Sequence, residues 1–213
     1  MNVEETMQRE VSRMLLQINT IKVQPSNPFT WASGWKAPIY CDNRKILSFP
    51  DTRTFIRDAF AGIVADKYPE AEIIAGVATG AIAHGVLVAE KLNLPFIYVR
   101  PEPKSHGLEN LIEGDFRPGQ KVVVIEDLVS TGTSSLKAAK AIAGNGGVVL
   151  GMVAIFTYEF PLARENFVQA GLDLTTLSSY QILIEQALEA GEITSDQLES
   201  LMQWREDPAN RGR

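Results

Sequence analysis

The stretch VVVIEDLVSTGTSS, residues 122–135, decides the fold class of this chain. It starts as an apolar strand, reaches the adjacent carboxylates Glu126 and Asp127, and then turns through small residues into a helix. Three other apolar runs rich in β-branched residues show no polar alternation, which is typical of strands buried on both faces of a parallel sheet. The four expected strands are EIIAGV (72–77), PFIYV (95–99), KVVVIE (121–126) and VVLGMVAIF (148–156).

Helical patterns surround these apolar runs. We expect helices at about 52–67, 80–92 and 133–143. Alternation of strands and helices favours an α/β fold of the doubly wound kind, with a mostly parallel central sheet flanked by helices.

The two ends of the chain differ from this middle. Residues 1–19 are expected to form an amphipathic helix, and residues 178–206 two short helices. A chain of 213 residues is long enough for one domain with small additions. We therefore expect a single domain with its core at about 51–178 and a small cap built from about 1–50 and 179–213.

The composition excludes several classes of protein. The net charge of −6 argues against a general nucleic-acid binder, because phosphate contacts need clustered Lys and Arg. No apolar run approaches the roughly 20 residues of a membrane span, and the acidic N-terminal stretch lacks the order of a signal peptide. The single cysteine, Cys41, excludes an intramolecular disulfide and fits a reducing compartment. We expect a cytoplasmic protein that binds neither membrane nor nucleic acid.

The end of the strand at 121–126 has the properties of a site for a phosphorylated sugar. A helix N-terminus preceded by Gly, Ser and Thr offers N–H groups, hydroxyls and a positive dipole end to a phosphate, and Gly132 allows a close backbone approach. The adjacent Glu126 and Asp127 suit sugar hydroxyls or a hydrated Mg²⁺. Neither a P-loop nor Gly-x-Gly-x-x-Gly occurs in the chain. The alternative is a strand that ends in solvated acids before a capped helix.

Residues 122–135 resemble the phosphoribosyl-diphosphate signature of type I phosphoribosyltransferases, in which two acidic and two apolar residues follow a strand and precede a small-residue turn. The resemblance implies the type I phosphoribosyltransferase fold. It implies that Thr131 to Ser134 hold the 5-phosphate and that Glu126 and Asp127 hold the ribose hydroxyls. The residues expected to bind phosphoribosyl diphosphate here are Glu126, Asp127, Leu128, Val129, Ser130, Thr131, Gly132, Thr133 and Ser134.

Further segments are similar to the orotate phosphoribosyltransferases of a bacterial subgroup: SGWKAPIYCDNR (33–44), RPEPKSHG (100–107) and IFTYE (155–159). In that family the first segment borders the base, which implies that Tyr40 lies near orotate. A tyrosine in the core is the alternative for Tyr40. We assign Ser130, in the phosphate turn, to orotate as well.

The segment RPEPKSHG resembles the family's mobile catalytic loop, which we expect at about 100–114. It carries Arg100, Lys104 and His106. The connection is long and shows no periodic pattern of apolar residues, and such a connection is either functional or disordered. Cations that close over a leaving diphosphate stabilise its developing charge. The expected catalytic residues are Lys104, His106 and Asp127, while Arg100 binds the diphosphate with them.

The family resemblance also implies Mg²⁺, held mainly by substrate and water, and a two-fold homodimer whose loop reaches into the neighbouring site. The turn at 76–81 faces the diphosphate in the family, although a simple strand-to-helix turn has the same glycines. Three family lysines are replaced here, by Ala32, Gly80 and Pro101. We interpret His84, in the helix after this turn, as a packed or surface histidine.

The expected reaction joins orotate to the ribose 5-phosphate of phosphoribosyl diphosphate, giving orotidine 5′-monophosphate and diphosphate. Orotate is already an anion, so no strong general base is needed. One rival is a phosphoribosyltransferase for another base, which would share residues 122–135 but lack the 33–44 and 100–107 segments. A second rival is a regulatory protein that senses phosphoribosyl diphosphate and binds nucleic acid, which would need a basic face.

Overall fold

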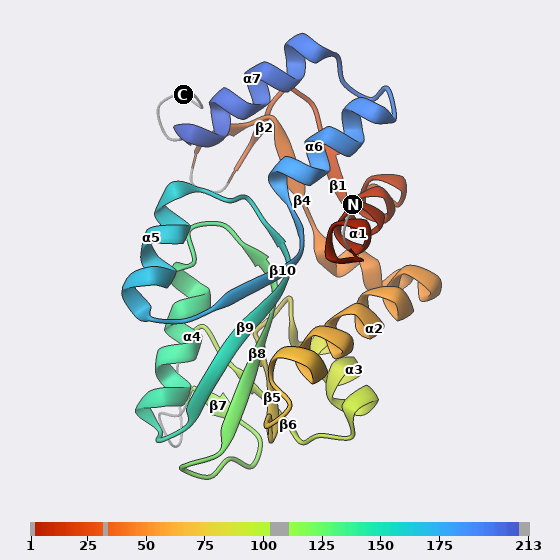
Figure 1. Cartoon of the computed structure of the whole chain (residues 1–213). Coiled ribbons are helices and arrows are strands. Elements are labelled where there is room, and N and C mark those ends of the chain that lie inside the picture. The colour runs from red at the N-terminus through yellow and green to blue at the C-terminus, as the bar shows by residue number, and fades with distance from the viewer. Residues whose placement is uncertain (1–2, 32–33, 103–110, 209–213) are drawn as a thin grey trace.

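A six-stranded sheet forms the centre of the chain (Figure 1). The computed structural model describes residues 3–31, 34–102 and 111–208. The strand order is β10-β9-β8-β5-β6-β7, and every neighbouring pair is parallel except β6 and β7. The strands are β5 (Ile73–Val77), β6 (Phe96–Val99), β7 (Ile112–Glu113), β8 (Lys121–Val129), β9 (Val148–Thr157) and β10 (Leu174–Ser179).

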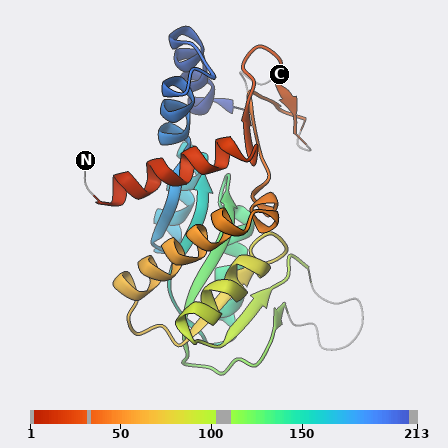
Figure 2. The same ribbon diagram turned by 90° about the vertical axis from the view of Figure 1, so that its right-hand side faces the viewer.

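Helices cover both faces of this sheet, which confirms the expected fold class. On one face lie α1 (Val3–Gln17), α2 (Pro50–Lys67) and α3 (Ile82–Leu92), the three helices that face the viewer in Figure 2. On the other face lie α4 (Thr133–Gly144) and α5 (Pro161–Ala170). The strands are buried between these layers, and β5 is buried at all its positions. Burial on both faces explains why the strand sequences lack polar alternation.

The structure differs from the sequence-based expectation at several elements. Strand β7, the edge of the sheet, lies inside the segment expected to be a loop at about 100–114. Strand β8 continues to Val129, three residues beyond the expected end at Glu126. Helix α5 and strand β10 were not predicted. Strand β10, LTTLSS, is rich in hydroxyl side chains, and α1 accommodates some of its polar groups. Ser12 hydrogen-bonds Ser178 in the interior, and Gln8 donates to the carbonyl of Thr176. Because a distant helix pairs its polar groups, β10 can be buried without an apolar run in its own sequence, and the sequence did not reveal it.

The terminal segments lie together beyond the carboxyl ends of the strands (Figure 1). Two small antiparallel pairs come from the N-terminal part, β1 (Ile21–Val23) with β4 (Ile39–Cys41) and β2 (Phe29–Thr30) with β3 (Lys36–Ala37). The 3₁₀ helix η1 (Asn43–Ser48) then leads into α2. The C-terminal part supplies α6 (Tyr180–Glu189) and α7 (Ser195–Glu206). Thr194 begins α7 with a reciprocal capping box to Gln197, which satisfies two otherwise free donors.

An aromatic cluster joins the terminal segments to the sheet. The ring of Trp204 in α7 lies 5.9 Å from that of Trp31 and 5.7 Å from that of Phe160, which follows β9. Tyr158 stacks on Phe160 at 5.3 Å and lies 5.1 Å from Trp31. Rings at these separations contribute packing beyond simple area burial. The cluster fixes the position of the N- and C-terminal segments over the end of β9.

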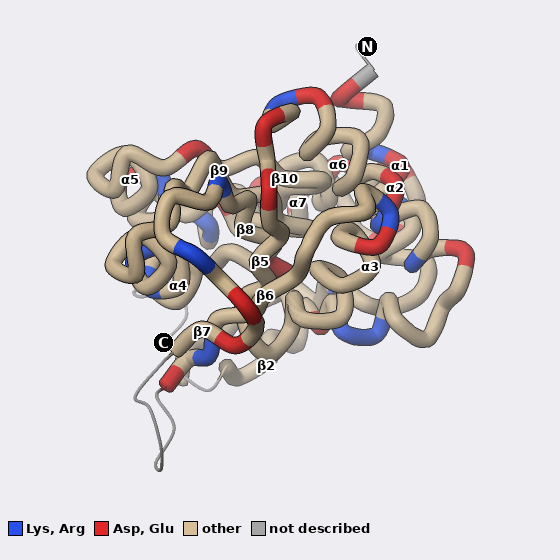
Figure 3. Tube along the Cα trace, turned by 90° about the horizontal axis from the view of Figure 1, so that it is seen from below, with Lys and Arg blue, Asp and Glu red and all other residues tan. Residues whose placement is uncertain are grey.

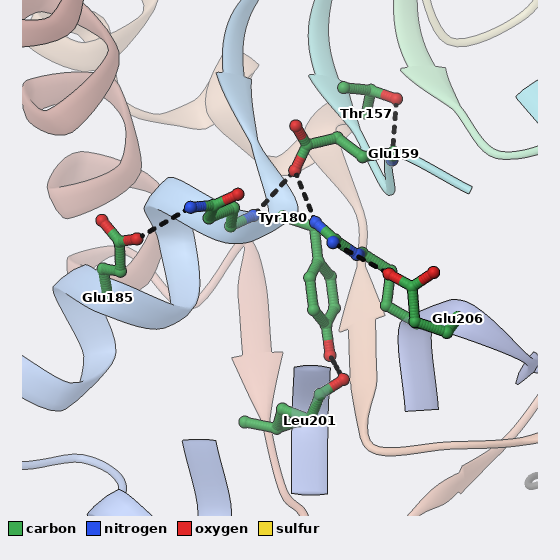
Figure 4. A network of polar contacts seen from close by, with 8 residues as sticks. Thr157, Glu159, Tyr180, Glu185, Leu201 and Glu206 are labelled. Atoms are coloured by element: carbon green, nitrogen blue, oxygen red, sulfur yellow. Dashed lines mark hydrogen bonds and ion pairs between the residues drawn. The ribbon is translucent and has the colours of Figure 1, made fainter. Parts of the chain in front are cut away.

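A polar network reinforces this junction (Figure 4). The Glu159 carboxylate accepts a hydrogen bond from the backbone N–H of Gln181 in α6, at 2.9 Å, and pairs with Arg205 of α7 at 3.4 Å. The Glu159 N–H in turn donates to the Thr157 hydroxyl at the end of β9. The tract IFTYE therefore carries the residues that hold both C-terminal helices to the sheet.

Residues of both charge signs are interspersed in the view from below the sheet. Lys and Arg positions lie among Asp and Glu positions there (Figure 3). Within the described ranges no helix has the length and apolar character needed to cross a bilayer.

Candidate active site

A cavity of about 440 Å³ opens where β5 and β8 end. Ligands in open α/β sheets bind beyond the carboxyl ends of strands, so this position is the expected one for a site. Three segments meet around the cavity, and the described residues that line it are 41–44, 77–80, 126–128, 130–132 and 134. A second cavity of about 390 Å³, between α5 and β10, is lined largely by apolar side chains.

Most residues of the expected phosphoribosyl-diphosphate site line this cavity together. Within 126–134, two positions lie elsewhere. Val129 is fully buried in the sheet, and Thr133 lines a separate groove between α4 and α5. Ser130 is among the lining residues.

The other expected site residues lie away from the cavity lining or outside the described chain. Tyr40 is 41% exposed, and its ring lies 5.6 Å from that of Phe29. Arg100 follows β6 and pairs with Glu113 of β7 at 3.6 Å. Lys104 and His106 lie outside the described residues, as does Ala32.

The turn between β8 and α4 has the geometry of an anion site. Gly132 has a φ of 78°, in the left-handed region that favours glycine, and a Cβ there would meet the Phe167 ring at 2.7 Å. Glycine at this N-cap provides no side-chain acceptor for the first N–H groups of α4. The hydroxyls of Thr131 and Thr133 lie 3.0 Å apart beside this turn. Uncapped N–H groups and the positive end of the helix dipole favour a bound phosphate.

The two carboxylates line the same cavity but contact different elements. Glu126 is 3% exposed, accepts from the Ser135 hydroxyl of α4 at 2.8 Å, and accepts from the Asp127 N–H at 2.9 Å. The Asp127 carboxylate instead lies against Gly80, in the turn before α3. Both residues lie in the extension of β8, whose alternating side chains let neighbours reach different elements.

Glu126 and Asp127 have different environments, which suit them to different roles. Burial, followed by the nearby charge of Asp127, raises the pKa of Glu126 well above its ordinary range. Glu126 therefore holds a proton to higher pH than a free glutamate. Asp127 is less buried and lines the cavity directly, which makes it the better carboxylate for a charged contact to a ligand.

Sequence reasoning did not single out Asn43. Its side chain is 1% exposed and donates from Nδ2 to the Asp127 carbonyl at 2.5 Å, joining η1 to the end of β8. His84 is packed in the interior at 2% exposure, where burial lowers its pKa, partly offset by the charge of Asp127 and a hydrogen bond to the Asn43 backbone. Asparagine is common in turns, so only the fold reveals that Asn43 fixes this wall of the cavity.

Curated proteins closely resemble this chain over nearly its whole length. An orotate phosphoribosyltransferase of Phocaeicola vulgatus is 56% identical over 206 residues, which is 97% of each chain. One of Porphyromonas gingivalis is 54% identical over 208 residues, covering 98% of this chain and 99% of the relative. No family model matches the sequence.

Solved structures agree with these relatives. The orotate phosphoribosyltransferase of Aeropyrum pernix superposes with a TM-score of 0.75 at 25% identity, over 86% of this chain and 99% of that one.

Proposed function

The chain belongs to the orotate phosphoribosyltransferase family, and from this premise we propose how its residues serve the family's reaction. That reaction transfers ribose 5-phosphate from phosphoribosyl diphosphate to orotate, giving orotidine 5′-monophosphate and diphosphate, in pyrimidine biosynthesis. The chain is a transferase of this kind. The observation that supports a residue-level assignment is the meeting of an anion turn and two carboxylates in one cavity.

The cavity divides into parts that match the parts of phosphoribosyl diphosphate. The turn from Thr131 to Ser134 receives the 5-phosphate at the N-terminus of α4. Asp127 and Glu126 hold the ribose hydroxyls, and Glu126 is fixed by hydrogen bonds from the Asp127 N–H and the Ser135 hydroxyl. Ser130 lies toward orotate. These contacts hold the sugar so that its anomeric carbon meets the base in a fixed geometry.

The remaining roles rest on the family resemblance. Arg100, Lys104 and His106 are proposed to bind the diphosphate as it leaves, and Lys104 and His106 to act in catalysis with Asp127. The free thiol of Cys41 is in keeping with a cytoplasmic location.

We assign Mg²⁺ as the cofactor. In the described part of the chain no three His, Cys, Asp or Glu side chains gather as a metal site. The donors present fit an ion carried by the substrate, because Mg²⁺ commonly keeps several waters and binds one or two carboxylates together with phosphates. When bound, the ion would neutralise diphosphate charge, and Asp127, which lines the cavity, would hold it or one of its waters.

Turnover with different bases tests the function. With Mg²⁺ and phosphoribosyl diphosphate, the protein is expected to convert orotate to orotidine 5′-monophosphate and to leave adenine unchanged, as followed by chromatography. Turnover of adenine in place of orotate would favour the first rival. Binding without turnover would favour a sensor, although the net charge of −6 opposes a nucleic-acid partner.

We further propose a two-fold homodimer in which loop 100–114 of one subunit completes the site of the other. Closed two-fold symmetry would give both partners the same arrangement. Two inactive variants, Lys104→Ala and Asp127→Asn, are unfolded together and refolded as a mixture. If the loop crosses, each mixed dimer has one site with both lesions and one with neither. Random pairing makes half the dimers mixed, so about a quarter of all sites should recover.

Each variant refolded alone is the control for this mixture. If Lys104 serves its own subunit, every site keeps one lesion, and activity stays at the average of the two parents. That result would contradict the shared site.

A further inference from the structure

The cavity at the end of β5 and β8 has an unusual charge balance for a site that receives an anionic base. Besides Glu126, which burial keeps protonated to higher pH, its described lining carries the carboxylates of Asp42 and Asp127. The same lining has a single cationic side chain in the described part of the chain, Arg44. Orotate brings a further carboxylate into this space, and a like charge there is unfavourable without a cation beside it.

Arg44 is held by a hydrogen bond at Nε of its guanidinium. Its Nε donates to the Asp42 carboxylate at 2.7 Å, and its side chain is 62% exposed. Among the residues that the structure describes, Asp42 is the hydrogen-bond and ion-pair partner of the Arg44 side chain, and the charge of Asp127 acts on it as well. Since Asp42 occupies the Nε side, the edge formed by the two terminal nitrogens remains for a ligand.

The backbone that carries Arg44 is fixed against the phosphate-binding strand. The neighbouring Asn43 is buried and donates to the carbonyl of Asp127, and Ile46 of the same 3₁₀ helix is fully buried. The Arg44 guanidinium therefore projects from a rigid support beside the carboxylate proposed to hold the ribose. The hydrogen bond from Nε to Asp42 restrains the side chain as well, which reduces the freedom lost when it binds a ligand.

We propose that Arg44 receives the carboxylate of orotate in the fork of its guanidinium and so selects this base over pyrimidines without that group. The planar fork matches a carboxylate through two parallel hydrogen bonds, which an ammonium group does not reproduce. Asp42 is then a positioning residue that orients the fork. This inference rests on the proposed function, because it takes orotate as the base.

The test compares two nucleotides that differ only in the carboxylate. Orotidine 5′-monophosphate and uridine 5′-monophosphate share ribose, phosphate and pyrimidine ring, and their dissociation constants are measured by calorimetry. In Arg44→Gln, affinity for orotidine 5′-monophosphate is expected to fall about tenfold, equivalent to about 1.4 kcal/mol. Affinity for uridine 5′-monophosphate should stay within about twofold of wild type. Arg44→Lys should lie between wild type and Arg44→Gln for the first nucleotide, because lysine keeps the charge and loses the fork.

Arg117→Gln is the matched control, since Arg117 is an 80% exposed arginine paired with Asp115 and lies outside the cavity lining. It should change neither affinity. Equal weakening of both nucleotides in Arg44→Gln would assign Arg44 to the phosphate or ribose and overturn the proposal, as would unchanged binding of both. A wild-type protein that binds neither nucleotide would contradict the proposed function itself, so the two failures are separable.

Discussion

Asp127→Asn is expected to lower turnover about ten- to a hundredfold or more while the protein remains folded. Asparagine keeps the shape of the side chain and removes its charge. One charge-assisted hydrogen bond contributes about 1.5–3 kcal/mol, which sets this range of rates. The backbone contacts of Asp127, to Asn43 and Glu126, do not involve its carboxylate, so thermal unfolding should change little. Steady-state kinetics with orotate and phosphoribosyl diphosphate measure the loss.

Asp115→Asn provides the comparison for charge removal alone. The Asp115 side chain is 90% exposed and pairs with Arg117 at 3.9 Å, so its loss should leave both turnover and stability near wild type. Near-normal turnover by a folded Asp127→Asn protein would show that the carboxylate does not hold the ribose.

Gly80→Ala is expected to reduce turnover as much as Asp127→Asn does. A Cβ at position 80 would lie 2.1 Å from Asp127 Oδ2 and 2.4 Å from its Cγ, so the carboxylate must swing away. A carboxylate at the end of a side chain can rotate, and the cost in unfolding free energy should therefore be about 1 kcal/mol or less. Gly62→Ala is the control, because a Cβ there meets nothing within 4 Å and lies inside α2. It should stabilise the protein by about 0.5–1 kcal/mol without affecting turnover.

The double variant separates displacement of Asp127 from damage to the turn. If alanine at position 80 acts through Asp127, Gly80→Ala combined with Asp127→Asn should be little slower than either single variant. Losses that multiply would mean that position 80 acts on its own. Any side chain at position 80 would displace Asp127 as it lies here.

The central strands could be predicted because their own residues are apolar enough to indicate burial. β5, β8 and β9 consist largely of apolar residues, many of them β-branched, and both faces are covered. β10 could not be predicted in this way, because α1 supplies partners for its polar groups from more than 150 residues away. The end of β8 was also misjudged. Glu126 and Asp127 interrupt the apolar pattern, yet the ladder continues, with Leu128 opposite Phe156 of β9.

The candidate site was predictable where small residues and acids follow a strand, and less so where the fold alone brings segments together. The small residues of the turn at 130–134 are recognisable in the sequence, and most of them line the cavity. Asn43 and Arg44 end the segment 33–44, whose resemblance pointed to the base but not to these two side chains, and they meet β8 because η1 packs against its end.

The pairing of α1 with the last elements of the sheet has a consequence for synthesis of the chain. Ser12 contacts Ser178, 166 residues later, and Arg9 pairs with Glu189 of α6. Translation proceeds at about 5–20 residues per second, so α1 leaves the ribosome roughly ten to thirty seconds before β10 and α6 exist. During that interval α1, whose Val11 and Leu15 are fully buried in the finished protein, lacks β10 and α6, the elements it contacts most. The nascent helix is therefore a segment that a ribosome-associated chaperone is expected to bind before β10 and α6 are made.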